Sequence, residues 1–431
     1  MKKLILVLLI IKGVLLSSMV DSVEINGVKV PLIFEKDSSL PIVSMQVIFK
    51  NSGSLFDGDK YGQARFTASM LGEGTKSLGA VGFAKKLEDS AIHLSASSGN
   101  ETFVFELSSL KEVFSRGVKL FDRLLKEPNF TQDSFDKIKL LKNSFIKQKE
   151  TDFDYIASHN LKKLLYADTP LAYNSIGTLE SLKKMRVNDI QEYFYKHIVL
   201  NNAVIVIGGD LTLKEAKVYT KDTLSSLKEG KSESLKFYQA SDKKEYKEVY
   251  QDTKQAYIYF GAPFNIGVKD ENSYKARVAT FILGAGGFGS RLMEEIRVKR
   301  GLAYSAYASL SLNLSNINIK GHLQTKIESK EEAIKLVKKV IKDFTTKGVT
   351  AEELDQAKKF LLGSEPLRNE TLTARLSRAF MLNYKGFEPE YYKKELKKIE
   401  DLKLEDLNKF ISSHNEINKL SFSIVTVKDG K

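Results

Sequence analysis

The chain has 431 residues, of which 42% are hydrophobic and 28% charged, a composition typical of a soluble globular protein with two or more domains. It contains no cysteine, which excludes a disulfide framework and a thiolate metal site. The formal net charge of +13 comes from lysines interleaved with acids, which is typical of a solvated surface. Attraction to acidic peptides or an anionic membrane is the alternative, and no nucleic-acid recognition motif accompanies the charge.

Residues 1–20 have the pattern of a secretory signal peptide. Two lysines precede an apolar run over residues 4–16, and two serines follow it. The run is interrupted by Lys12 and is shorter than the roughly 20 apolar residues that a membrane-spanning helix needs. We therefore predict export, to a periplasm, with cleavage near Ser18 and no stable membrane insertion afterwards. An uncleaved N-terminal tether is the alternative.

The first half of the chain after this segment begins with strands and continues with long helices. Periodicity predicts strands at 23–33, 41–50, 92–97, 102–107 and 203–207, and helices at 61–71, 110–126, 131–149 and 188–197. In the first of these helices, apolar residues from Tyr61 onward recur at helical spacing and predict a buried stripe. Arg65 and Ser69 lie four residues apart and therefore share a different face of the same helix.

The second half of the chain repeats the first. Matching positions are 71 and 283, 131 and 350, and 188 and 405, with offsets of 212, 219 and 217 residues. The strand at 203–207 likewise has a counterpart at 422–427, and a near-constant displacement over four elements indicates an internal duplication.

A stretch poor in apolar residues, 226–250, predicts a linker between the two copies. Each copy places strands early and helices late. We therefore predict an α+β fold of two duplicated halves, 21–225 and 251–431, each a mainly antiparallel sheet covered by helices.

Residues 290–301 predict a helix with marked ends, because Ser290 suits an N-cap and Gly301 suits the position after the last turn. Arg297 falls in its last turn and Tyr304 opens the next strand. From these residues alone, Arg297 is a cation that complements the helix dipole. The glycine run at 284–289 matches the dinucleotide fingerprint in form but lacks the acid about 20 residues further on, so it predicts a tight, flexible turn into the helix.

The segment at 59–75 resembles a known motif region. Its Gly74-Thr75 and the upstream Asn-Ser-Gly-Ser at 51–54 are similar to the flanks of the inverted zinc motif, His-x-x-Glu-His, of the insulinase-type (mitochondrial-processing-peptidase-like) metallopeptidases. The resemblance implies zinc ligands at the positions of Arg65 and Ser69 and a general-base glutamate at Ala68.

None of these three side chains can perform the role that the resemblance assigns to its position. Arg65 has no lone pair to offer a metal, Ala68 cannot take a proton, and Ser69 is a poor zinc ligand. In the family, a third ligand, a glutamate, follows about 75 residues later, yet the segment 137–149 contains no acid. We therefore predict that this chain holds no metal and does not hydrolyse peptides alone.

A second signature is retained. The run from Ser290 to Tyr304, Ser-Arg-Leu-x-x-x-Ile-Arg-x-x-x-Gly-Leu-Ala-Tyr, is similar to the family's second-half signature. The resemblance implies that Arg297 and Tyr304 reach the zinc site of a facing half or partner chain and bind substrate near the scissile bond.

The sequence therefore predicts a non-catalytic subunit of an exported heterodimeric zinc peptidase. The zinc is expected in a homologous partner subunit, and the substrate is a peptide or an unfolded polypeptide. One of the predicted strands, 92–97 or 102–107, could align a peptide by adding it to the edge of the sheet. Both could equally be ordinary strands of the sheet, and the residues do not separate these two interpretations. The alternative function is a structural or peptide-holding protein of the same fold without a catalytic partner.

Overall fold

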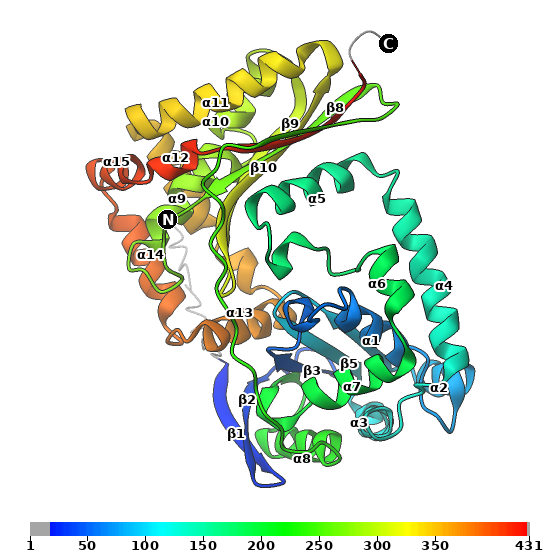
Figure 1. The fold of residues 1–431 in the computed structure, drawn as a ribbon. Coiled ribbons are helices and arrows are strands. Elements are labelled where there is room, and N and C mark those ends of the chain that lie inside the picture. Colours follow the sequence, from blue (N-terminus) through cyan, green and yellow to red (C-terminus); the bar gives the residue numbers. More distant parts are fainter. Residues whose placement is uncertain (1–17, 429–431) are drawn as a thin grey trace, which may run out of the picture.

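Two β-sheets, one from each half of the chain, form the frame of the molecule in this computed structural model, which describes residues 18–428 (Figure 1). The first sheet has the strand order β1-β2-β6-β3-β5-β4 and the second the order β7-β11-β8-β10-β9. The strands of the first sheet are β1 (Met19–Ile25), β2 (Val28–Lys36), β3 (Ile42–Lys50), β4 (His93–Ser98), β5 (Thr102–Leu110) and β6 (Ala203–Gly209). Those of the second are β7 (Tyr246–Tyr250), β8 (Gln255–Pro263), β9 (Ala303–Leu312), β10 (Ile317–Lys326) and β11 (Ser421–Thr426).

The two sheets have the same topology apart from the additional strand β1. Each contains one parallel pair, β2 with β6 and β7 with β11, and its other neighbours are antiparallel. Strands β2, β6, β3, β5 and β4 thus correspond in order to β7, β11, β8, β10 and β9. The predicted α+β fold of two duplicated, mainly antiparallel halves is confirmed.

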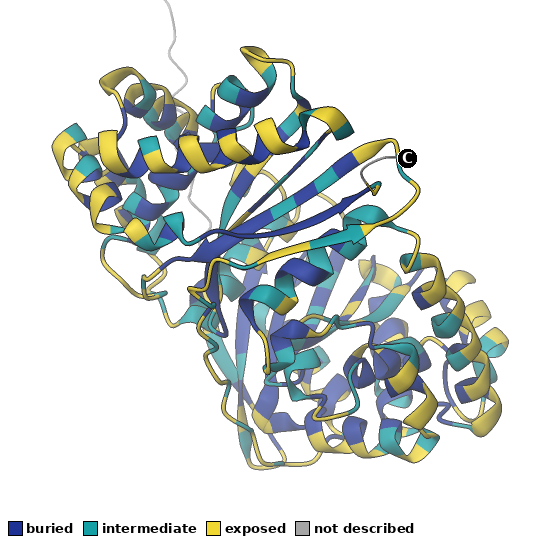
Figure 2. Ribbon diagram, turned by 45° about the horizontal axis from the view of Figure 1, so that its top comes forward, coloured by how far each residue is buried: buried dark blue, intermediate teal, exposed yellow. Residues whose placement is uncertain are grey.

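Helices follow the same repeat. The first half contains α1 (Gln63–Leu71), α2 (Gly79–Glu88), α3 (Lys111–Lys126), α4 (Gln132–Lys149), α5 (Phe153–Leu165), α6 (Leu179–Lys184), α7 (Val187–His197) and α8 (Leu213–Leu224). The second contains α9 (Ser273–Thr280), α10 (Arg291–Met293), α11 (Lys330–Lys347), α12 (Ala351–Gly363), α13 (Leu372–Lys385), α14 (Tyr391–Asp401) and α15 (Leu404–Ser413). Equivalent threonines, Thr131 and Thr350, cap α4 and α12 by accepting a backbone N–H from the third residue of the helix. The central strands are largely buried, the edge strands β4 and β7 are not, and the outer faces of the helices are exposed (Figure 2).

The first predicted strand, 23–33, is wrong as a single element. The chain reverses at Asn26 and Gly27, whose φ angles are 49° and 82°, so that β1 and β2 form an antiparallel hairpin. A two-residue turn with positive φ at both positions suits Asn-Gly, and it matches the twist of the flanking strands. The Asn-Gly pair was therefore the signal for this hairpin.

The predicted linker also needs correction at its end. No helix or strand occupies 226–245, but the last five residues of the predicted range form β7, which pairs parallel with β11. Of the predicted signal segment, 1–17 lies outside the described residues, and Met19 and Val20 begin β1. Within residues 18–428, no helix combines the length and the apolar character needed to cross a bilayer.

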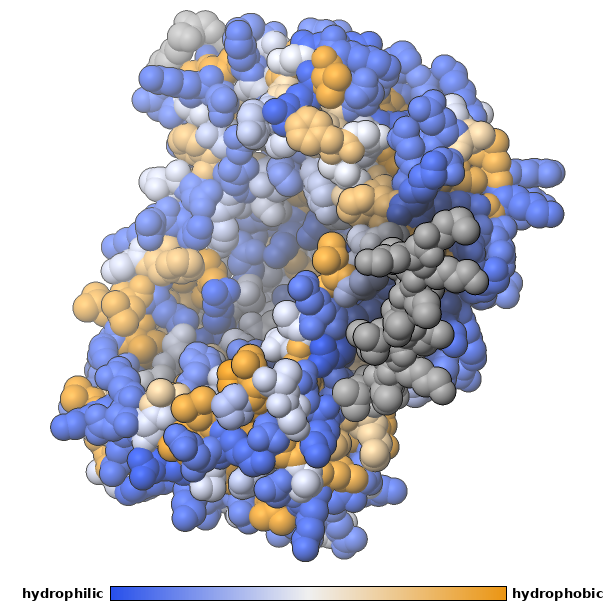
Figure 3. Space-filling view, turned by 180° about the vertical axis from the view of Figure 1, so that it is seen from behind, coloured by the Kyte–Doolittle hydropathy of each residue, from blue (hydrophilic) through white to orange (hydrophobic). Residues whose placement is uncertain are grey.

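The two halves exchange a helix. The inner face of the first sheet packs against α13 of the second half, through a buried cluster that includes Ile33, Val206 and Leu376. Conversely, α5 of the first half packs on β8 and β11 of the second sheet, where Leu161 and Leu165 are buried. Each half therefore supplies a helix that covers the sheet of the other half. Seen from behind, the surface is hollowed where they meet (Figure 3).

Candidate functional site

The position of the predicted degenerate zinc motif is a groove between α1 and α4. Helix α1 is held at its start by Asp57, whose carboxylate accepts the backbone N–H groups of Gly62 and Ala64 at 2.7 and 2.8 Å. The helix is buried on most of its surface, and Ala68 is only 6% exposed. Arg65 is exposed and Ser69 is partly exposed on the remaining face, as the four-residue spacing predicted.

Helix α4 supplies the opposite wall of this groove. A cavity of about 330 Å³ is lined by Arg65 and Ser69 from α1 and by an apolar surface on α4 that includes Leu141 and Phe145. The one titratable group that α4 adds is Lys142. Burial, and then the charge of Arg65, lowers the pKa of Lys142 to about 8.

This groove does not fit a zinc ion. Zinc requires lone pairs from nitrogen, sulfur or carboxylate oxygen, whereas Arg65 is a permanent cation and Lys142 adds a second positive group. The nearest acid to the end of α1, Glu73, is bound to Lys137 at 2.8 Å. Nowhere in residues 18–428 do three histidine, aspartate or glutamate side chains gather as a metal cluster.

The second predicted pair, Arg297 and Tyr304, is brought together. The ring of Tyr304 lies 4.4 Å from the Arg297 guanidinium, and the ring of Phe288 lies 4.7 Å from it. Tyr304 is 82% exposed and Phe288 is 70% exposed. Among the described residues, the Arg297 guanidinium forms no hydrogen bond or ion pair, so its N–H donors remain available while two rings pack against its plane.

The backbone that presents Arg297 differs from the predicted regular helix at 290–301. Only Arg291–Met293 is α-helical, and Glu294–Val298 forms a π-helical turn in which the Lys299 N–H reaches the Glu294 carbonyl at 2.9 Å. A π turn accommodates one extra residue and is frequent at functional sites. Gly301, with φ of 63°, then turns the chain into β9 and brings Tyr304 back alongside Arg297.

Two participants were missed by the sequence interpretation. Phe288 belongs to the glycine run at 284–289, where a single exposed aromatic among glycines was the available signal. Lys142 lies in the acid-free segment of α4, but nothing in the sequence indicated that it faces Arg65. Of the two strands predicted for edge addition, only β4 has a free edge, because β5 pairs with both β3 and β4.

Comparison with known proteins identifies the family and the fold. The insulinase (peptidase family M16) model matches residues 32–179, and the peptidase M16 inactive domain model matches residues 184–361. A Helicobacter pylori protein described as the non-peptidase homolog YmxG is 43% identical over 431 residues, covering 99% of both chains. This chain belongs to peptidase family M16, the insulinase family.

Solved structures place the M16 fold over nearly the whole chain. A crystal structure of a peptidase M16 inactive domain from Pseudomonas fluorescens has a TM-score of 0.87 at 24% identity, covering 96% of this chain and 98% of that one. The periplasmic protease PqqL from Escherichia coli has a TM-score of 0.77 at 16% identity, and the match covers 96% of this chain but 48% of PqqL. The chain therefore carries both M16 domains.

Proposed function

We propose that this chain is an exported, non-catalytic subunit that pairs with a homologous chain carrying an intact zinc motif. In this pair the partner would supply the metal and the general base, and this chain would supply Arg297 and Tyr304 and close one side of a peptide chamber. The signal pattern at 1–20 is the basis for export.

The length of a protease with the same fold supports pairing. PqqL, a protease of the same fold, is about twice as long as the region that this chain matches, so a single PqqL molecule contains room for two such units. This chain matches one such unit, and the groove at its own motif position is lined by Arg65 and by Lys142 of the facing helix. A second chain is the simplest source of the missing ligands.

The observation that carries the proposal is the presentation of Arg297. Packing against two rings restricts the orientation of the guanidinium, and none of its donors is used within the described chain. A planar fork of free N–H groups fits a carbonyl oxygen or an oxyanion, and the Tyr304 hydroxyl adds another donor beside it. A purely structural arginine at a helix end would instead be expected to bind nearby carbonyls or acids, as Arg300 binds Glu295 at 2.7 Å.

The chemical role is electrostatic. Fixed donors aimed at an oxygen that gains negative charge stabilise the transition state more than the ground state, and removing one such donor typically costs about 10²–10³ in kcat. Arg297 and Tyr304 would bind this oxygen, while the exposed ring of Phe288 keeps the guanidinium oriented.

The test is steady-state kinetics on the reconstituted two-chain complex with a fluorogenic peptide. Arg297→Ala and Tyr304→Phe should each lower kcat by about 10²–10³ without loss of assembly, which size-exclusion chromatography checks. Arg297→Lys should rescue only in part, because a point charge does not reproduce the planar fork. Arg300→Ala is the matched control, since it removes a cation of the same turn that is already paired with Glu295.

The alternative is a structural or peptide-holding role without catalysis. An unchanged kcat in both variants of an assembled complex would favour it, because Arg297 would then act only as a cation near the end of the helix. Failure of any zinc-bearing homologue to form a complex with the chain would contradict pairing itself.

A further inference from the structure

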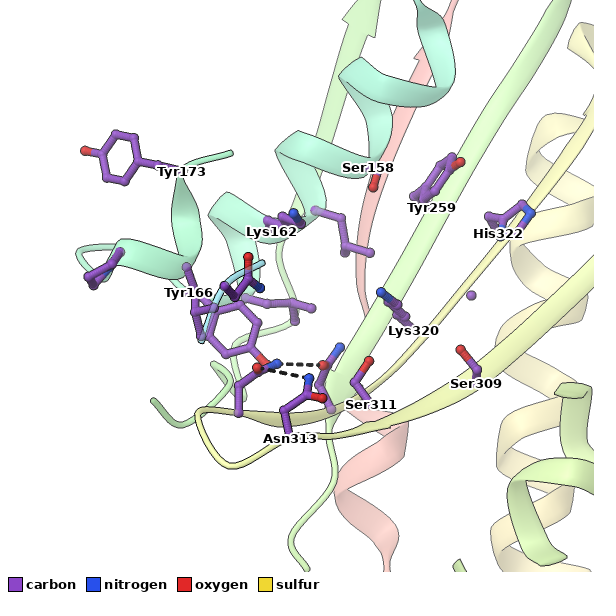
Figure 4. Close-up of a pocket in the computed structure, with 18 of the residues that line it drawn as sticks. Ser158, Lys162, Tyr166, Tyr173, Tyr259, Ser309, Ser311, Asn313, Lys320 and His322 are labelled. Carbon is purple, nitrogen blue, oxygen red and sulfur yellow. Dashed lines mark hydrogen bonds between the residues drawn. The ribbon is translucent and has the colours of Figure 1, made fainter. Parts of the chain in front are cut away.

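A cavity of about 390 Å³ lies where the exchanged helix α5 meets the second sheet, and its volume is within the range of ligand-binding pockets. Figure 4 shows Ser158 and Lys162 on the α5 side and Tyr259, Lys320 and His322 on the sheet side. Gly261 on β8 permits this close approach, since an added Cβ would lie 2.9 Å from the side chain of Leu165 on α5. The cavity thus exists only because a helix of the first half covers a sheet of the second.

The charges in this cavity are of one sign. Lys162 and Lys320 line it, and no carboxylate of the described chain does. The Lys162 ammonium donates only to the amide oxygen of Asn174, at 3.3 Å, and the Lys320 ammonium forms no hydrogen bond or ion pair among residues 18–428. Lys162 is partly exposed and Lys320 is exposed, so both charges are reachable by a ligand, and neither has an acidic partner in the described chain.

The closest acids are committed to other groups. Asp154 accepts hydrogen bonds from the Tyr259 hydroxyl at 3.0 Å and from Gln324 at 2.8 Å. Glu101, from the first half, accepts from Ser315 and from the Tyr384 hydroxyl. Neither carboxylate contacts a lysine of the cavity, so the positive charge there is not neutralised locally.

The charge of Lys320 also disfavours the charge of Lys162. Burial, and then the charge of Lys320, lowers the pKa of Lys162. An anion placed between them would be attracted by both and would relieve this unfavourable pairing. Binding of an anion would therefore reduce the repulsion between Lys162 and Lys320 that is present in the free protein.

The remaining lining suits a peptide rather than a bare ion. The hydroxyls of Ser158, Ser309 and Ser311 form no hydrogen bond within the described chain and can donate to or accept from a main chain. Tyr259 and Tyr307 add aromatic surface beside them. A phosphate site would instead be lined mainly by donors, whereas this cavity offers donors, acceptors and rings together.

We propose that this cavity binds a short peptide segment carrying a carboxylate, with Lys162 and Lys320 contacting the carboxylate and the serine hydroxyls contacting the main chain. This inference takes the peptide-binding part of the proposed function as its premise, and it assigns that function a preference for acidic substrates. The site belongs to this chain alone and does not involve Arg297 or a partner.

The experiment measures binding to the isolated full chain by isothermal titration calorimetry. The probes are the capped tripeptide Ac-Ala-Glu-Ala-NH2, its isosteric neutral counterpart Ac-Ala-Gln-Ala-NH2, and inorganic phosphate. The glutamate peptide should bind at least about tenfold more tightly than the glutamine peptide, because a hydrogen bond to a charged group is stronger than one between neutral groups. Phosphate should bind more weakly than the glutamate peptide.

Single variants locate the site. Lys162→Gln and Lys320→Gln should each reduce the preference for the glutamate peptide several-fold. Of the two, Lys320→Gln is the safer variant for folding, because the Lys320 side chain is exposed. Lys163→Gln is the matched control, since Lys163 is the next residue of α5, carries the same charge and does not line the cavity. It should leave the preference unchanged.

Three results would overturn the inference: equal affinity for the two peptides, equal losses in the Lys163 and Lys162 variants, or displacement of the peptide by phosphate of higher affinity. The proposed pairing is tested separately, because these titrations contain no partner chain. A chain that binds the glutamate peptide but no zinc-bearing homologue would retain this site and lose the proposed catalytic role.

Discussion

Arg375 of α13 binds the first half of the chain to the second. Replacing it with alanine should show how much this ion pair contributes to the free energy of unfolding, apart from the hydrophobic core. Its guanidinium binds Glu35 at the end of β2 and, at 2.6 Å, Asp37 just beyond it. Another of its N–H groups donates to the carbonyls of Asn369 and Glu370 at 3.1 Å. The side chain of Glu35 is only 1% exposed; Arg375 is the cation paired with it, and the Ser18 hydroxyl also donates to it at 2.7 Å.

The expected magnitude follows from what remains after the change. Arg375→Ala leaves Glu35 buried without its cation, and removing one partner of a buried pair typically costs about 3–5 kcal/mol. The truncated side chain also loses its contact with two carbonyls at the start of α13. We therefore expect the free energy of unfolding to fall by about 3–5 kcal/mol, a large share of the stability of an ordinary domain.

Urea unfolding followed by circular dichroism and by tyrosine fluorescence measures this change. The matched control is Lys394→Ala, which breaks an exposed pair with Glu388 inside the second half and should leave the unfolding midpoint unchanged. The double variant Glu35→Leu with Arg375→Leu should recover most of the loss, because no carboxylate then stays buried at position 35, while the more exposed Asp37 keeps its hydrogen bonds from Ser39.

A loss below about 1 kcal/mol in Arg375→Ala would refute the reasoning, since Glu35 would then be hydrated rather than buried against α13. A double variant as unstable as the single one would show that packing, and not the unpaired charge, sets the cost.

The remaining predictions concern the degenerate motif and a buried histidine. The triple variant Arg65→His/Ala68→Glu/Ser69→His should neither retain zinc after dialysis nor cleave a fluorogenic peptide. The reason is that α4 offers Lys142 in place of a third zinc ligand. Peptide turnover at a rate typical of zinc peptidases would contradict this. His197 is 2% exposed, and burial lowers its pKa to about 4, so the unfolded chain binds a proton more readily than the folded chain between pH 6.5 and 4. The free energy of unfolding should therefore be highest above pH 6.5 and fall by up to about 3 kcal/mol as the pH falls towards 4. Urea unfolding midpoints measured over this range should depend on pH, and this dependence should be weaker in His197→Phe.

Local patterns predicted most elements of the fold. Helices α3, α4 and α7 and strands β3 to β6 lie close to the predicted ranges, because each has a clear apolar period. The errors occur where a local feature overrides the period, as at the Asn26-Gly27 turn and at the π turn of Glu294–Val298. The free edge of β4 could not be separated from the paired β5, since period-2 alternation does not reveal strand neighbours.

The sequence by itself determined the duplication, the family and the loss of the zinc motif, because these depend on which residues stand at which spacing. In any conformation, Arg65 has no lone pair for a metal, Ala68 cannot take a proton, and Ser69 is a poor zinc ligand. Only the tertiary structure decided which elements meet: α5 on the second sheet, Phe288 against Arg297, and Lys162 near Lys320 in one cavity. The physical reason is that an amphipathic period specifies which face of an element is buried, whereas the partner that buries it is chosen by packing between segments far apart in the chain.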